Sequence, residues 1–154
     1  MPTGRDFTVV IDYAHTPDGL GNICRTMKDC CSGRLVTVFG CGGDRDRTKR
    51  PEMGRIAAEI SDFLVVTSDN PRSEEPGAII RDILVGVAER QTPYVVVENR
   101  VEAIHWAIEH AEPGDTILLA GKGHETYQVL ADGVIHLDER EVVAEALRKT
   151  KGKA

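Results

Sequence analysis

Apolar positions along the chain alternate between two kinds of spacing, which predicts alternating strands and helices. Short runs rich in Val, Ile, Leu and Phe predict strands at 7–11, 35–39, 63–67, 94–97 and 116–119. Between these runs, apolar residues recur three and four positions apart, which predicts helices at 17–31, 51–61, 75–91 and 101–111. The first helix, for example, places Leu20, Cys24 and Met27 on one face.

The last part of the chain has a different pattern. Two short apolar runs, 127–130 and 134–137, flank Ala131-Asp132-Gly133, and Asp-Gly is a strong turn signal, so we expect a β-hairpin. Asp138 is a good N-cap for a final helix that reaches about Arg148.

These elements predict one doubly wound α/β domain over residues 1–154. The strand runs are nearly continuous rather than alternating, which is typical of parallel strands with helices on both faces. We expect a Rossmann-like, mostly parallel sheet of about six strands, to which the hairpin adds an antiparallel strand at one edge.

Composition narrows the function classes. The chain of 154 residues has a net charge of −6, which argues against a nucleic-acid surface. No apolar run approaches the roughly 20 residues of a membrane span, and the N-terminus lacks the apolar core of a signal peptide. The four cysteines have no metal-binding spacing, so we expect no metal site, reduced thiols and a cytoplasmic protein.

Chemically unusual residues follow four of the five predicted strands. In parallel sheets the carboxyl ends of the strands meet at one edge, where ligands bind. We therefore expect a binding site at that edge. The loop after the fourth strand, Glu98-Asn99-Arg100, predicts little beyond a helix start. The four loops are Asp12-Tyr13-Ala14-His15-Thr16-Pro17-Asp18, Gly40 to Arg47, Asp69-Asn70-Pro71-Arg72 and Gly121-Lys122-Gly123-His124-Glu125.

The loop Asp69-Asn70-Pro71-Arg72 has two interpretations. An Arg fork matches a carboxylate, whereas Asp and the Asn carbonyl accept from an ammonium, so the loop suits a ligand with both groups. Alternatively it is an Asx-type turn in which Pro71 fixes φ and Arg72 is solvated.

The other loops also have structural alternatives. Glycines 40, 42 and 43 could provide positive φ in a turn, and residues 44–47 could be a self-neutralising, solvated segment in which Arg45 is the best ligand candidate. Neither these glycines nor Gly121-Lys122-Gly123 completes a dinucleotide or nucleoside-triphosphate motif. His15 and His124 are either site residues or structural hydrogen-bonding residues.

These loops, in this order, resemble those of the C-terminal domain of the Mur ligases, and within that family its MurE branch. The resemblance rests on 12–18, 40–46, Lys49-Arg50-Pro51, 69–72 and 121–125 followed by Tyr127-Gln128, and it spans nearly the whole chain. It implies the third domain of a three-domain enzyme whose UDP-sugar and ATPase domains lie outside these residues. Such an enzyme acts as an ATP-dependent ligase of peptidoglycan synthesis.

The resemblance also implies substrates and cofactors. ATP, with Mg²⁺ bound mainly by the central domain, phosphorylates the free carboxylate of UDP-MurNAc-L-Ala-D-Glu. The amine of meso-diaminopimelate then attacks the acyl phosphate. We expect the isolated domain to bind the amino acid without turnover and to be a monomer.

Roles for individual residues follow only from the resemblance. Arg45 and Arg72 are expected to bind carboxylates of meso-diaminopimelate, with Arg72 rejecting lysine because lysine lacks a distal carboxylate. Asp69, Asn70 and Pro71 help to fix the distal centre. Gly121 and Glu125 receive the distal ammonium. Asp12 is expected to reach the ATP ribose, and His15, the one candidate for a catalytic role, to lie near the phosphates.

Three other functions remain open on the sequence. A stand-alone module that recognises an amino-acid zwitterion fits the length of the chain. The C-terminal domain of a folylpolyglutamate synthetase fits the layout, although residues 69–72 argue against it. A nicotinamide-dependent oxidoreductase is disfavoured because the dinucleotide fingerprint is missing.

Overall fold

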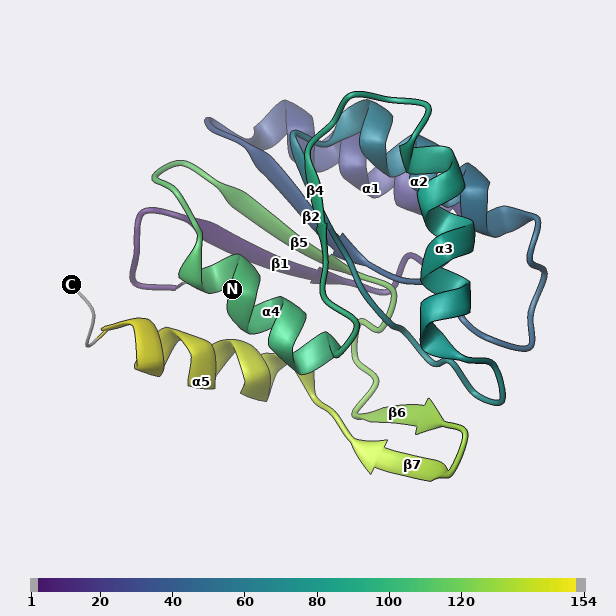
Figure 1. Cartoon of the computed structure of the whole chain (residues 1–154). Coiled ribbons are helices and arrows are strands. Elements are labelled where there is room, and N and C mark those ends of the chain that lie inside the picture. Colours follow the sequence, from purple (N-terminus) through teal and green to yellow (C-terminus); the bar gives the residue numbers. More distant parts are fainter. Residues whose placement is uncertain (1–2, 152–154) are drawn as a thin grey trace.

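The computed structural model describes residues 3–151 and has a five-stranded parallel sheet covered by helices on both faces (Figure 1). The sheet has the order β1-β5-β2-β3-β4, so β5 is inserted between β1 and β2. The strands are β1 (Thr8–Asp12), β2 (Leu35–Phe39), β3 (Phe63–Val66), β4 (Tyr94–Val96) and β5 (Thr116–Ala120). The doubly wound α/β prediction is confirmed.

Two helical layers cover this sheet. On one face lie α1 (Pro17–Cys30), α2 (Lys49–Ile60) and α3 (Pro76–Val87), and on the other lie α4 (Arg100–Glu109) and α5 (Glu139–Lys151) (Figure 1). Successive residues of the central strands serve the two layers in turn, because side chains alternate across a strand. Leu35 and Phe39 pack in the first core, whereas Val36 and Val38 pack in the second.

Helix starts lie within one residue of the predicted positions, except for that of α2. The Thr16 hydroxyl accepts from the Gly19 amide at 3.1 Å, and Asp138 accepts from the Arg140 amide at 3.0 Å. Helix α2 begins at Lys49, two residues before the predicted Pro51. Proline is tolerated there because amides in the first helical turn have no intrahelical partner.

The hairpin is the main correction to the predicted fold. Strands β6 (Tyr127–Leu130) and β7 (Gly133–His136) form their own antiparallel sheet, so the main sheet has five strands rather than about six. The backbone of β6 bonds the loop after β3 instead of an edge strand. The Arg72 amide donates to the Val129 carbonyl at 3.0 Å, and the Val129 amide donates to Asn70 Oδ1 at 3.0 Å.

Candidate functional site

A cavity of about 360 Å³ lies at the carboxyl edge of the sheet, where the four predicted loops meet. All four loops and the start of α2 contribute to its wall. The lining residues are Tyr13, His15, Thr16, Gly40, Cys41, Gly42, Arg45, Asp46, Lys49, Arg50, Met53, Asp69, Asn70, Arg72, Gly121 and Glu125.

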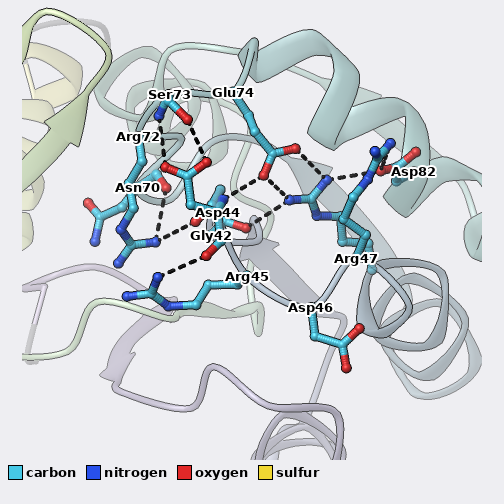
Figure 2. A network of polar contacts seen from close by, with 12 residues as sticks. Gly42, Asp44, Arg45, Asp46, Arg47, Asn70, Arg72, Ser73, Glu74 and Asp82 are labelled. Carbon is cyan, nitrogen blue, oxygen red and sulfur yellow. Dashed lines mark hydrogen bonds and ion pairs between the residues drawn. The ribbon is translucent and has the colours of Figure 1, made fainter.

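One end of the cavity is cationic. Arg72 and Arg45 both line it, and Figure 2 shows their guanidinium groups on the same side of the 40–47 loop. Nη1 of Arg72 donates to the Gly43 carbonyl at 2.9 Å, and Nη1 of Arg45 donates to the Asp44 carbonyl at 2.9 Å. Neither guanidinium is paired with a carboxylate among the described residues, so both charges are available to an anionic ligand.

The backbone at this end is unusual. Arg72 and Asp44 have φ of 53° and 55°, a left-handed conformation that costs a non-glycine residue about 1–2 kcal/mol. Asn70 Oδ1 accepts from the Val129 amide and the Arg72 amide donates to the Val129 carbonyl, so the interpretation of 69–72 as an Asx-type turn is wrong. Arg72 itself is half-buried. The strain instead accompanies a side chain that faces the cavity.

The buried guanidinium of Arg50 holds together the loops that form this cationic end. Arg50 donates to Glu74 at 2.6 Å and 3.1 Å, to Asp82 at 3.0 Å and to the Gly42 carbonyl at 3.1 Å. Arg50, with a further hydrogen bond from the Asp44 amide, lowers the pKa of Glu74 to about 2. The 40–44 loop is thereby tied to the loop that follows Arg72.

The predicted alternatives for the 40–47 loop are wrong except in one respect, because residues 44–47 are all exposed. Glycines 40, 42 and 43 do not have positive φ. A Cβ on Gly43 would instead overlap the Pro71 carbonyl oxygen, so this glycine allows two backbones to touch. Nor is the segment self-neutralising, because the Asp44 carboxylate accepts from Ser73 and Arg47 pairs with Asp82 at 3.4 Å.

The other end of the cavity carries carboxylates around a buried lysine. The Lys122 ammonium lies 3.3 Å from Asp69 Oδ1, 2.9 Å from Asn70 Oδ1 and 3.4 Å from Glu125 Oε1, and its side chain is 0% exposed. Asn70 Oδ1 also accepts from the Val129 amide at 3.0 Å. These acceptors, which the sequence assigned to a ligand ammonium, therefore already hold an internal one.

A second buried arginine positions the strands that carry this end. Arg100 donates to the Ser68 carbonyl after β3 at 3.0 Å, to the Ala120 carbonyl of β5 at 2.9 Å and to Glu139 at 2.9 Å. Burial disfavours its charge, but Glu139 and Asp69 more than compensate and raise the pKa of Arg100. Arg100 thus links the two strand ends from which Asp69 and Gly121 emerge.

The comparison with known families decides where this arrangement belongs. Residues 1–123 match the family described as "Mur ligase, glutamate ligase domain", which is most of the chain. The chain belongs to the Mur ligase family. Its resemblance to the C-terminal domain of that family, predicted from the loops, is confirmed.

Similar curated proteins share one name. The chain is 55% identical over 151 residues to a UDP-N-acetylmuramoyl-L-alanyl-D-glutamate--2,6-diaminopimelate ligase of Caldanaerobacter subterraneus subsp. tengcongensis, covering 98% of this chain and 31% of the relative. A ligase of the same name from Syntrophomonas wolfei is 56% identical over 146 residues, covering 94% of this chain and 30% of the relative. The chain therefore spans about a third of the length of the curated relatives that it matches.

Solved structures agree on the fold. The structure of a UDP-N-acetylmuramoyl-L-alanyl-D-glutamate--2,6-diaminopimelate ligase matches with a TM-score of 0.90 at 39% identity, covering 96% of this chain and 30% of that one. Folylpolyglutamate synthase of Mycobacterium tuberculosis matches with a TM-score of 0.54 at 21% identity, covering 92% of this chain and 29% of that one. The second likeness concerns the fold alone.

The structure brings most predicted site residues of this Mur ligase domain to one cavity. Arg45, Asp69, Asn70, Arg72, Gly121, Glu125 and His15 all line it. Pro71 and Asp12 do not. Pro71 is buried and its carbonyl accepts from the Glu74 amide at 3.0 Å, so it shapes the loop. Asp12 accepts from the Ala14 amide at 2.9 Å.

Three basic residues of this Mur ligase domain were missed as site residues in the sequence. Lys122 was considered only as part of an incomplete phosphate loop, Arg50 only as part of a motif, and Arg100 as a helix start. All three are buried. A charged residue in the middle of a loop or helix start gives no signal of burial until its partners, which are distant in sequence, are known.

The cavity wall also contains a cysteine that is poorly suited to chemistry. Cys41 is buried beside Met53, with the two sulfurs 3.6 Å apart, and burial raises the pKa of its thiol to about 12. The protonated thiol is a weak nucleophile. Within residues 3–151 no three His, Cys, Asp or Glu side chains are grouped to hold a metal, and no helix is long and apolar enough to cross a membrane.

Proposed function

We propose that this chain is the amino-acid-binding domain of a ligase that adds meso-diaminopimelate to UDP-MurNAc-L-Ala-D-Glu with ATP. The observation that carries the proposal is the charge layout of the cavity. Arg45 and Arg72, which have no carboxylate partner within residues 3–151, line one part of it, and Asp69 and Glu125 line another. The exposed Asp46 and Lys49, of opposite charge, also line it. The relatives that are 54–56% identical carry the name of this activity.

The cavity matches an amino acid that is charged at both ends. Diaminopimelate carries a carboxylate and an ammonium at each of its two centres. A carboxylate suits the Arg72 and Arg45 forks, which offer planar donors. An ammonium suits Asp69 and Glu125, since they hold one negative charge more than Lys122 neutralises.

Discrimination against lysine follows from the same layout. Lysine has only an ammonium at its distal end, so Arg72 would face it without an anionic partner. An unmatched charged group at a binding site costs more than a good hydrogen bond contributes. The domain therefore selects diaminopimelate through the distal carboxylate.

Only two residues of this domain, Asp12 and His15, are proposed to contact ATP. Asp12 Oδ2 accepts from the Ala14 amide, whereas Oδ1 has no hydrogen-bond partner among residues 3–151 and could bind a ribose hydroxyl. His15 is exposed and stacks edge-on against Tyr13 at 4.9 Å. ATP, when bound, supplies the phosphoryl group that activates a carboxylate. The residues of this chain orient the attacking amine, which is catalysis by positioning.

The chain alone is therefore expected to bind without turnover. Its sequence lacks the Gly-x-x-x-x-Gly-Lys-Ser/Thr phosphate loop. A dissociation constant near 1 mM for the amino acid would correspond to about −4 kcal/mol. ATP hydrolysis or ligation by the 154-residue chain alone would contradict this part of the proposal.

Calorimetric titration with meso-diaminopimelate and with L-lysine tests the proposed specificity. We expect the wild-type chain to prefer diaminopimelate, and Arg72→Ala to remove the preference. Arg81→Ala is the matched control, because Arg81 is exposed on α3 and does not line the cavity. Equal binding of both amino acids by the wild type would refute the assignment.

A further inference from the structure

The geometry points to Lys122 as a positioning residue that serves as a built-in counter-cation, so that the carboxylate end of the cavity accepts one ligand ammonium and no more. The inference deepens the proposed function, and its ligand-binding part rests on that function. Lys122 need not touch the ligand, because it acts through Asp69, Asn70 and Glu125.

The contacts of Lys122 fit this role better than that of an exposed phosphate-binding lysine. Its ammonium has three protons, and three acceptors lie within 3.4 Å of it, one each on Asp69, Asn70 and Glu125. The Tyr127 ring adds a cation–π contact at 5.9 Å. A buried ammonium with all its protons engaged is held in place and is not free to follow a phosphate.

The acceptors come from two loops that are not neighbours in sequence. Asp69 and Asn70 follow β3, whereas Glu125 follows β5, and β2 lies between these two strands in the sheet. Without a cation, two carboxylates of this cluster would repel each other across the gap. Lys122 holds the two loops in register and keeps both carboxylates beside the cavity.

The net charge of the Asp69, Glu125 and Lys122 cluster determines which further group it can bind. Asp69 and Glu125 together exceed Lys122 by one negative charge. Asp69 Oδ2 has no partner among the described residues, and Glu125 Oε2 accepts from the Tyr127 hydroxyl at 3.3 Å. Asp69 Oδ2, together with the remaining lone pair of Glu125 Oε2, can therefore receive one ammonium from the ligand.

Chemical rescue distinguishes this role from ordinary packing. Lys122→Ala should lower the thermal midpoint, and methylammonium should restore much of it by refilling the vacated position. Lys122→Met removes the same charge but keeps the bulk, so methylammonium should not restore it. Lys28→Ala is the control, because Lys28 forms an exposed 2.6 Å ion pair with Asp62 and should show no rescue.

Ligand selectivity supplies the second readout. 2-Aminopimelate lacks one ammonium of diaminopimelate, so the wild-type chain should prefer diaminopimelate by about tenfold, which corresponds to about 1.4 kcal/mol. Lys122→Ala leaves a second carboxylate uncompensated, so the preference for diaminopimelate should rise, and methylammonium should bring it back toward the wild-type ratio in that variant alone. If the wild type binds neither compound, the proposed function fails while the thermal rescue still tests Lys122.

A measurement on the wild type covers the case in which both variants fail to fold. Lys28, Lys49 and Lys149 are exposed, so their ammonium protons exchange quickly with water. Lys122 should give a slowly exchanging ¹H–¹⁵N ammonium signal at neutral pH. Absence of that signal, or equal rescue of Lys28→Ala by methylammonium, would overturn the inference.

Discussion

The two ends of the cavity present opposite charges and are built in opposite ways. At the anionic end Asp69, Lys122 and Arg100 are buried, and both cations are held by partners from several elements. At the cationic end Arg45 is exposed and Arg72 is half-buried, and each donates only to backbone carbonyls among the described residues. The buried end is fixed before a ligand arrives, whereas the open end keeps its charges free for the ligand.

This difference implies that stability and recognition are concentrated in different places. Removing a buried ionic partner leaves an uncompensated charge in the interior, which is costly. Removing an exposed arginine should hardly change the stability of the fold and should lower only the affinity for the ligand. Substitutions at the two ends should therefore fall into two groups, one that mainly lowers stability and one that mainly weakens binding.

The largest effect on stability should come from Arg100→Met. The change leaves Glu139 buried without its partner and frees the Ser68 and Ala120 carbonyls, so we expect a loss of about 3–5 kcal/mol in the free energy of unfolding. Urea denaturation followed by circular dichroism measures the loss. An unchanged urea midpoint would show that the buried end is not the rigid one.

Arg50→Met should have an intermediate effect and should act on both properties. The guanidinium is buried, but Glu74 and Asp82 are partly exposed and can be rehydrated, so we expect a loss of about 1–3 kcal/mol in stability. Binding of diaminopimelate should also weaken, because the Gly42 carbonyl loses its tether. If stability falls while the affinity for diaminopimelate stays the same, Arg50 does not support the binding of the ligand at the cationic end.

The pH dependence of stability should reveal the same support. Arg50 lowers the folded-state pKa of Glu74 from 4.5 to about 2, so its contribution to stability is complete above pH 4.5 and is lost as the pH falls toward 2. Glu74→Gln removes this titrating group and should flatten the curve in that window. Urea midpoints of both proteins between these pH values test it, and parallel curves would argue against the Arg50–Glu74 contact.

The smallest effect on stability should come from Arg45→Ala. Its guanidinium is exposed and has a single backbone acceptor among the described residues, so the free energy of unfolding should change by no more than about 0.5 kcal/mol. Affinity for diaminopimelate should nevertheless fall by about tenfold, or roughly 1.4 kcal/mol. Calorimetry beside urea denaturation separates the two quantities, and a clear loss of stability would remove the contrast between the ends.

The sequence was sufficient to predict most helices and strands, because these elements depend on local periodicity. Strand β2 was predicted at its observed residues, and α1 ends one residue earlier than predicted. Local sequence patterns could not predict where the hairpin packs, because β6 is held by Asn70 and by the backbone of Arg72, which are distant in sequence. Its short apolar run and the Asp-Gly turn that follows predict a hairpin, but not which part of the molecule the hairpin bonds.

The site was predictable to the level of loops, but not to the level of contacts. Topology alone brings the ends of β1, β2, β3 and β5 together, so the polar loops there mark a site. Lys122 donates to Asp69 and Asn70. This contact depends on the conformation of a long, flexible side chain, which the sequence does not show. The same holds for Arg100, whose three partners lie 20 to 39 residues away in sequence.

A crystal of the chain soaked with meso-diaminopimelate would show the bound ligand itself. We expect one ligand carboxylate within hydrogen-bonding distance of the Arg72 guanidinium. We also expect one ligand ammonium beside Asp69 or Glu125, with Lys122 still in its buried position. A ligand bound elsewhere, or one whose carboxylate avoids Arg72 within a filled cavity, would contradict this expectation.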